Sequence, residues 1–272
     1  MRLLAILVGA KSAPACLDAA TLAARALDHA SVEALHVIVD PDHMIAASEE
    51  IAIQQFRVVE EGTAWQRAKA TRSAFAAWKT EAGACGCAVQ WKTLTGHEEE
   101  IVCREAGAAD VVMLVMAREA NLDSGDALHA AIFRCDKPVL IIPREWRRGS
   151  RAGFDHVVVG LSNGEAARHA IEGAGPWLRA AKRVSAIRIG DRDDATLGLS
   201  RLLIEAGVEP ALHVVPKHGS DLGAQIIGEA HAVGADLLVS GAYRHSEMVD
   251  WLLGGTTRHM LAAADLPLLL AH

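Results

Sequence analysis

Short runs of aliphatic residues alternate along this chain with longer segments whose apolar residues recur at helical spacing. In the first half, the predicted strands lie at residues 3–8, 34–39, 88–92, 110–115 and 138–142, and all but 88–92 are predominantly aliphatic. In the second half, they lie at residues 156–161, 183–189, 211–215, 236–240 and 267–270. Such runs are typical of strands that are covered on both faces. The pattern predicts an α/β fold whose parallel strands alternate with helices.

The two halves of the chain repeat three motifs in the same order. Residues 8–12 are echoed by 159–163, residues 107–112 by 233–238, and residues 136–142 by 265–271. The polar stretch 147–153 is the natural linker between the halves. We therefore predict two domains, 1–146 and 154–272, each an open, parallel, five-stranded sheet of the Rossmann-like class with flanking helices. The long helical pattern of residues 48–82 has only 191–206 as its counterpart, so the halves have diverged.

Charge and hydropathy exclude two classes of function. The net charge is −7 and no cluster of lysine and arginine stands out, which argues against a nucleic-acid surface. No apolar run approaches the roughly 20 residues that span a membrane. Residues 3–8 resemble part of a signal peptide, but the similar run 157–160 opens the second half, where no export signal can act. We expect both runs to be buried first strands of a cytoplasmic protein.

Cysteine and histidine residues show no metal-binding pattern. The five cysteines are Cys16, Cys85, Cys87, Cys103 and Cys135. Their odd number and irregular spacing indicate reduced thiols rather than a disulfide framework. The thirteen histidines are scattered without ligand spacing, so no metal site is predicted. The acidic run 98–100 is expected to decorate a helix N-terminus, where acids are favoured.

One loop in the second half carries candidate chemistry. It begins with Gly241, after the fourth predicted strand, and ends with Gly254, Gly255, Thr256 and Thr257 at the start of an apolar helix. Free backbone N–H groups and the helix dipole favour an anion there, and the threonines add hydroxyl donors. The alternative is an ordinary helix start capped by threonine, with no ligand.

The loop and the repeat together resemble tandem proteins of the universal stress protein family. The family motif is glycine, two residues, glycine, nine residues, glycine, then serine or threonine. Gly241 matches the first glycine and Gly254 the third, whereas Arg244 replaces the second and Gly255 stands at the hydroxyl position. The resemblance implies a Rossmann-like, nucleotide-binding α hydrolase-like fold. It also implies a stress-response regulator that binds ATP or another adenine nucleotide, accompanied by Mg²⁺ where a metal is needed, or a member that binds none.

The nucleotide-binding residues implied by this resemblance include two beyond the loop. The full set is Gly241, Arg244, His245, Gly254, Gly255, Thr256, Thr257, Ser162 and Asn163. Ser162 and Asn163 follow the first strand of the second half, where nucleotide-binding relatives carry an acid. Their side chains can hydrogen-bond a ribose, but less strongly than a carboxylate does. Arg244 either obstructs the pocket or pairs with a phosphate.

The corresponding loop of the first half lacks these features. In alignment, the four residues matching 254–257 are Gly125, Asp126, Ala127 and Leu128. Val115 matches Gly241. A carboxylate repels an anion and both hydroxyls are gone, so we predict a structural role for this half.

Three functions remain open at this stage. They are a nucleotide-sensing regulator, a nucleotide-independent scaffold that acts through protein contacts, and an ATP-hydrolysing enzyme. The enzyme is disfavoured because no general base or pair of metal-binding carboxylates stands near the loop. Relatives dimerise through their last strands, here 138–142 and 267–270. We predict that these meet within one chain as an internal pseudo-dimer, which is compatible with a homodimer of the whole chain.

Overall fold

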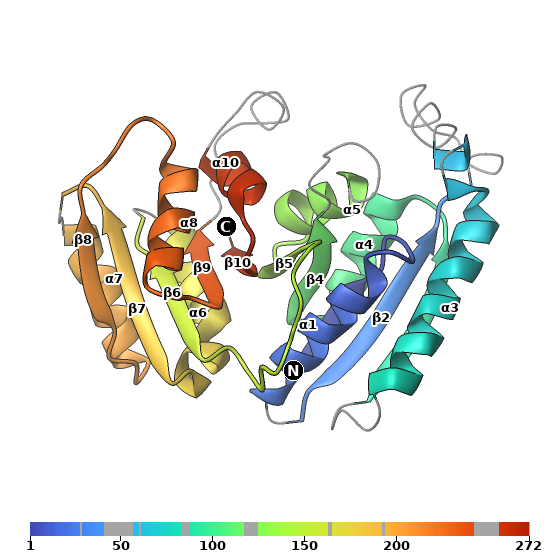
Figure 1. Ribbon diagram of the computed structural model, residues 1–272, viewed down its shortest axis with the longest axis horizontal. Helices are drawn as coiled ribbons and strands as arrows, with labels where there is room; N and C mark the ends of the chain where they lie inside the picture. Colours follow the sequence, from blue (N-terminus) through green and yellow to red (C-terminus); the bar gives the residue numbers. More distant parts are fainter. Residues whose placement is uncertain are drawn as a thin grey trace. The chain divides into compact units, whose positions relative to one another are not determined.

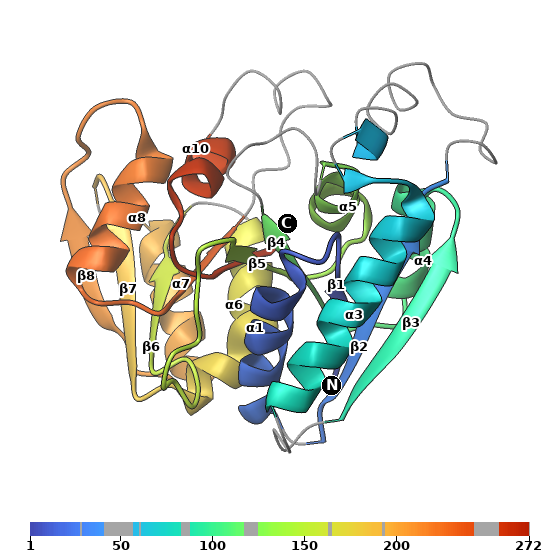
Figure 2. The ribbon, with the colours of Figure 1, turned by 45° about the vertical axis from the view of Figure 1, so that its right-hand side comes forward.

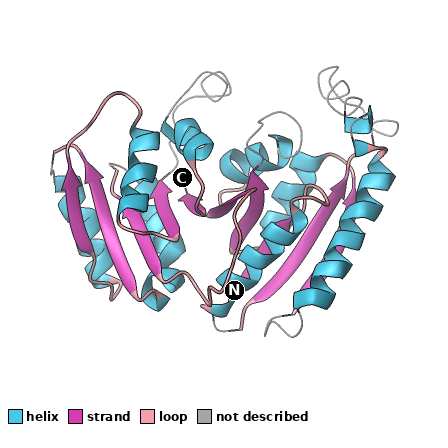
Figure 3. Ribbon diagram, in the orientation of Figure 1, coloured by secondary structure: helices cyan, strands magenta, loops and turns pink. Residues whose placement is uncertain are grey.

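The computed structural model describes residues 1–27, 29–40, 57–59, 61–82, 88–116, 125–162, 165–191, 194–241 and 256–271. The chain divides into two compact units. The first comprises Met1–Lys137 and Arg147–Gly149, and the second comprises Pro138–Trp146 and Ser150–His272. Each unit contains a sheet with helices on its faces (Figures 1 and 3).

The first unit is a parallel sheet of strand order β3-β2-β1-β4. Its strands are β1 (Arg2–Ile6), β2 (Ser31–Ile38), β3 (Val89–Thr95) and β4 (Val111–Met116). Its helices are α1 (Ala13–Arg25), α3 (Ala64–Ala82), α4 (Glu98–Ala106), α5 (Gly125–His129) and the π-helix η2 (Ala130–Arg134). Helices α1 and α3 cover one face, and α4, α5 and η2 lie on the other (Figure 2).

The second unit has the parallel order β8-β7-β6-β9-β10. Its strands are β5 (Val139–Pro143), β6 (His156–Gly160), β7 (Arg183–Ile189), β8 (Ala211–Val215), β9 (Leu237–Gly241) and β10 (Leu268–Ala271). Its helices are α6 (Glu165–Ala180), α7 (Asp194–Glu205), α8 (Leu222–Ala232) and α10 (Thr256–Ala263). Strand β5 pairs antiparallel with β10, so that Leu140 lies opposite Leu269. The two predicted last strands therefore meet within the chain.

The predicted α/β class with a mostly parallel sheet is confirmed, because strands form at all ten predicted positions. Residues 57–59 and α3 are helical within the predicted segment 48–82, and its residues 48–56 lie outside the described part. The division into domains 1–146 and 154–272 stays a prediction, and β5 groups with the second unit. In the described ranges, no helix combines the length and apolar character needed to cross a membrane.

An aspartate in each copy of the repeated motif, 107–112 and 233–238, anchors the first strand of its unit. Asp110 Oδ2 accepts a hydrogen bond from the backbone N–H of Arg2 at 2.7 Å. Asp236 accepts from the N–H groups of Asp155 and His156 at 2.8 and 3.1 Å. Since a strand's first N–H groups need a partner when the strand lies inside a sheet, the motif has a structural cause.

The strand register corrects one predicted correspondence between the halves. Leu3 lies opposite Val111 in the first unit, and Val157 lies opposite Leu237 in the second. Once the two motif aspartates are matched, Ile6 is the counterpart of Gly160. The predicted match of residues 8–12 to 159–163 is therefore wrong by three residues. The connection from β1 to α1 is longer than that from β6 to α6, and sequence similarity within a loop does not report strand pairing.

Candidate functional site

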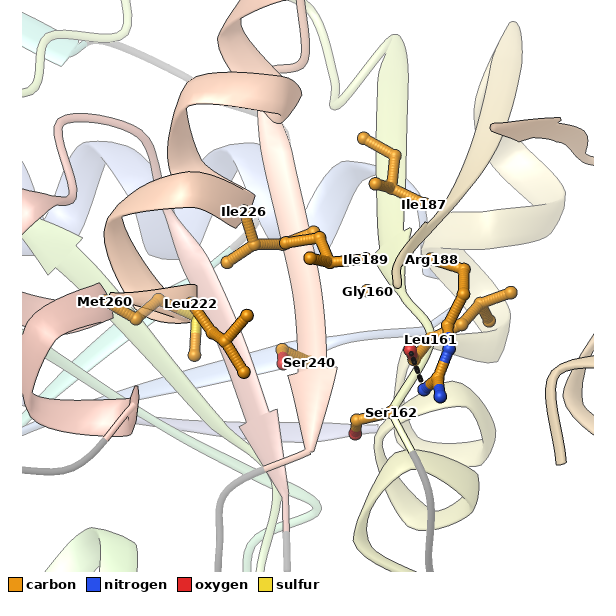
Figure 4. A pocket seen from close by; sticks show the side chains of 10 residues that line it. All are labelled: Gly160, Leu161, Ser162, Ile187, Arg188, Ile189, Leu222, Ile226, Ser240 and Met260. Atoms are coloured by element: carbon orange, nitrogen blue, oxygen red, sulfur yellow. Dashed lines mark hydrogen bonds between the residues drawn. The ribbon is translucent and has the colours of Figure 1, made fainter. Parts of the chain in front are cut away.

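A cavity in the second unit lies where β6, β7 and β9 end (Figure 4). It is lined by Gly160, Leu161, Ser162, Ile187, Arg188, Ile189, Leu222, Ile226, Ser240 and Met260. From β6 the chain proceeds to β7 and β8 on one side, and β9 then lies on the other side of β6. The cavity thus lies at the point where the strand order reverses, the usual ligand position in open parallel sheets.

Small residues on adjacent strands make this space available. A Cβ atom at Gly160 would lie 3.5 Å from Ser240 Oγ and 3.6 Å from Ile226 Cγ1. A methyl group would therefore fit there, but it would occupy part of the cavity. Leu222, Ile226 and Met260 provide an apolar wall from α8 and α10 (Figure 4).

The cavity is small in the part of the chain that the structure describes. The cavity measures about 80 Å³, below the roughly 300 Å³ at which small-molecule pockets usually begin. The chain continues past Ser162 and past Gly241 into residues outside the described part.

Arg188 on β7 contributes a positive charge to the lining. Its Nη1 donates a hydrogen bond to the carbonyl oxygen of Leu161 at 3.2 Å (Figure 4), and its Nε donates to that of Asp191 at 3.1 Å. The guanidinium thus holds the backbone just after β6 and places a cation beside Ser162. Sequence reasoning missed this residue. Its signal was a charged residue near the carboxyl end of β7, the end at which open parallel sheets bind ligands.

The predicted site residues are only partly within the described chain. Ser162 lines the cavity, and Gly241 ends β9 beside it. Thr256 and Thr257 begin α10, as the helix prediction required, and Met260 of the same helix reaches the cavity. The remaining predicted residues, Asn163, Arg244, His245, Gly254 and Gly255, lie outside the described residues.

Gly241 has a packing role that the sequence did not reveal. A Cβ atom at this position would lie 2.6 Å from the backbone nitrogen of Ala167 and 2.8 Å from the carbonyl carbon of Ala166. Side-chain carbons do not approach backbone atoms so closely. Contact between β9 and α6 therefore requires glycine here whether or not an anion binds nearby.

The equivalent position in the first unit is filled by aliphatic side chains. Gly160 and Ser240 are the next residues after the paired Val159 and Val239 of β6 and β9. The equivalent residues on β1 and β4 are Ile6 and Leu114, which are paired with each other. Ile6 is 1% exposed and Leu114 is fully buried. Two bulky residues thus replace the two small ones, which supports a structural role for this unit more directly than Asp126 does.

A buried charge network lies near the strand ends of the first unit. Glu98 begins α4, as predicted for the acidic run, but the structure buries its side chain. Burial raises the pKa of Glu98 to about 7, and Asp126 adds to the rise. Arg57, Arg67 and the N–H of Ala127 oppose it. Arg57 also donates to the carbonyl oxygen of Val8 at 3.4 Å, so internal ionic contacts occupy this region.

Histidine, cysteine and acidic side chains do not assemble into a metal site in the portion of the chain that the structure describes. His156 has a structural role. His156 Nε2 lies 2.9 Å from Ser185 Oγ, and its Nδ1 lies 2.8 Å from the Arg183 guanidinium. Burial lowers the pKa of His156, and the charge of Arg183 adds to this effect.

Comparison with known proteins identifies the fold. No family model and no curated protein matches the sequence. A universal stress protein from Archaeoglobus fulgidus has a similar structure, with a TM-score of 0.62 and 13% identity over 99% of this chain and 95% of that chain. A putative universal stress protein from Pseudomonas aeruginosa gives 0.55 and 14%, over 99% and 92% of the two chains.

A third similar structure is a functionally unknown protein from Pseudomonas aeruginosa. Its TM-score is 0.54 and its identity 15%, over 99% of this chain and 92% of that chain. The three structures show that this chain has the α/β fold found in universal stress proteins. At these identities the likeness concerns the fold.

Proposed function

We propose that this chain is a regulatory protein of the universal stress type that binds ATP or another adenine nucleotide through its second half. The observation that carries the proposal is the cavity beside Gly160, at the reversal of strand order. It combines an apolar wall with a few polar groups, which is the usual composition of small-molecule sites.

The residues of the cavity suit different parts of a nucleotide. Leu222, Ile226 and Met260 offer an apolar surface for the base. The hydroxyls of Ser162 and Ser240 can hydrogen-bond a ribose, and the guanidinium of Arg188 favours the charge of a phosphate. The phosphates would extend to the predicted loop residues Arg244, His245, Gly254 and Gly255 and to the start of α10. Mg²⁺ would accompany them by binding phosphate oxygens.

The proposal includes a divergent tandem repeat. The strand order around β6 in the second unit matches that around β1 in the first. Only the second unit has the small residues at the reversal point, so only one nucleotide is expected per chain. The antiparallel pairing of β5 with β10 supports an internal pseudo-dimer of the two repeats.

Equilibrium titration of ATP, ADP and adenosine into the purified full chain tests this function. Wild type should bind at least ATP or ADP with a stoichiometry of one. Gly160→Ala should weaken binding and Gly160→Ile, which copies the first unit, should abolish it. Gly198→Ile on α7 is the control, because Gly198 has open space around it and lies away from the cavity lining. A wild-type chain that binds none of the three compounds would overturn the proposal.

One observation favours the scaffold function as the second candidate. Helix α7 exposes Leu197 and Ile204, which are 44% and 61% accessible. They are seven residues apart, so they lie on one face of the helix. Exposed apolar pairs of this kind suit protein contacts. If the titrations show no nucleotide binding, this face is where we expect the chain to act.

A further inference from the structure

Two cysteines of the first unit lie side by side. Cys103 is on α4, and Cys135 directly follows the π-helix η2. The Sγ atoms are 3.3 Å apart, and the thiol of Cys135 donates a hydrogen bond to the sulfur of Cys103. Both are free thiols in this structure. A disulfide requires the sulfurs to approach to about 2.05 Å, a movement that small rotations of the two side chains can supply.

The two thiols differ in access to solvent. Cys103 is half-buried, whereas Cys135 is buried. Burial raises the pKa of Cys135, and the hydrogen bond to Cys103 adds to the rise. Burial and protonation both disfavour a reaction of Cys135 with peroxide from solvent, whereas its position against Cys103 suits it to react with an oxidised Cys103. Solvent-borne reagents reach Cys103 first.

Charged side chains frame the pair. Arg134, the residue before Cys135, forms a 2.9 Å ion pair with Glu99, which lies one helical turn before Cys103. Asp136, the residue after Cys135, has a positive φ of 49°, a conformation that non-glycine residues rarely adopt. The ion pair of Arg134 with Glu99 joins the segment just before Cys135 to α4, the helix that carries Cys103.

We propose that Cys103 and Cys135 form a reversible redox site that a hydroperoxide converts to a disulfide. The sulfur of Cys103 attacks hydrogen peroxide, the O–O bond breaks, and sulfenic acid and water form. The sulfur of Cys135 then attacks that of Cys103. The S–S bond forms, the S–O bond breaks, and the hydroxyl leaves as water with the Cys135 proton. Two thiols are oxidised and one peroxide is reduced to two water molecules.

The disulfide would tie α4 to the end of η2. It would close a loop that contains β4, α5 and η2. Cross-linking would therefore rigidify the first unit under oxidising conditions. This inference does not depend on nucleotide binding in the second unit.

The test uses the full chain with Cys85→Ser and Cys87→Ser, which leaves Cys16, Cys103 and Cys135. The protein is treated with stoichiometric hydrogen peroxide, blocked with N-ethylmaleimide, digested and analysed by mass spectrometry. We expect a peptide pair that links Cys103 to Cys135, lighter by two hydrogens and separated by dithiothreitol. Cys16, which is 1% exposed, should stay a free thiol and serves as the internal control.

Two further variants assign the roles of the thiols. In Cys135→Ser, Cys103 should accumulate as sulfenic acid that dimedone traps. In Cys103→Ser, Cys135 should remain unmodified. Over-oxidation of Cys103 to sulfinic acid in the parent protein, without the linked peptide, would overturn the proposal. So would a link from Cys103 to Cys16. These outcomes are decided in the protein that carries only Cys85→Ser and Cys87→Ser, so poor folding of a further variant does not affect the test.

Discussion

Gly241 and Ala167 approach so closely that a Cβ atom on Gly241 would lie 2.6 Å from the backbone nitrogen of Ala167. This contact fixes α6 against β9 beside the cavity. We expect Gly241→Ala to lower the free energy of unfolding by about 2 kcal/mol or more, the usual cost of overpacking a rigid contact. Urea denaturation measures this change. Gly160→Ala is the matched control and should cost much less, because its new methyl group meets its neighbours at ordinary distances. Equal stability of the two variants would show that α6 can shift away from β9.

Arg188 should discriminate between charged and uncharged adenine ligands. If its guanidinium favours phosphate, Arg188→Gln should weaken ATP binding about tenfold, equivalent to about 1.4 kcal/mol, and change adenosine binding little. Arg188→Lys should retain part of the affinity for ATP because it keeps the charge.

Isothermal titration of both ligands measures the effect of Arg188, with Arg201→Gln on the exposed side of α7 as the control. An equal loss for ATP and adenosine would contradict a phosphate role. It would indicate instead that Arg188 acts through its hydrogen bond to the carbonyl of Leu161.

Glu98 should make the stability of the chain depend on pH near neutrality. Its pKa is raised from 4.5 to about 7 in the folded protein, chiefly by burial. Between these values the native state binds more protons than the unfolded state, so the free energy of unfolding falls as pH rises through this window. Glu98→Gln removes this contribution.

Urea denaturation at pH 5 and pH 8 tests the role of Glu98. From pH 5 to pH 8, the free energy of unfolding of wild type should fall by on the order of 2 kcal/mol more than that of Glu98→Gln, since one pKa unit corresponds to about 1.4 kcal/mol. Glu100→Gln, in the same helical turn but exposed, should behave like wild type. Identical pH dependence in wild type and Glu98→Gln would show that the folded protein keeps Glu98 ionised.

Asp236 and Asp110 should contribute to stability in parallel ways. Each accepts hydrogen bonds from backbone N–H groups at the start of the first strand of its unit. Asp236→Ala and Asp110→Ala should each cost about 0.5–1.5 kcal/mol, the usual net contribution of such a hydrogen bond. Chemical denaturation provides the measurement, with Glu205→Ala at the exposed end of α7 as the control. A cost within error of the control would mean that water replaces these carboxylates.

Local features of the sequence determined the elements and their order. Aliphatic runs between polar segments predict the central strands β1, β4, β5, β6, β9 and β10, because a strand covered on both faces needs apolar side chains throughout. Thr256 and the acidic run from Glu98 mark the helix starts of α10 and α4, since helix ends have local capping and charge preferences. The motif between Gly241 and Thr257 predicts an anion-binding loop in the second half, and this role stays a prediction.

Only the tertiary structure decided what those elements bring together. Strand register depends on pairing between distant segments. It shows that Ile6, and not Gly9, is the residue of the first half that corresponds to Gly160. Packing also brings Gly241 of β9 against α6, buries Glu98, and places Cys103 against Cys135. Arg188 joined the cavity for the same reason. Each of these relationships arises between residues far apart in the chain, where periodicity and capping carry no information about distance.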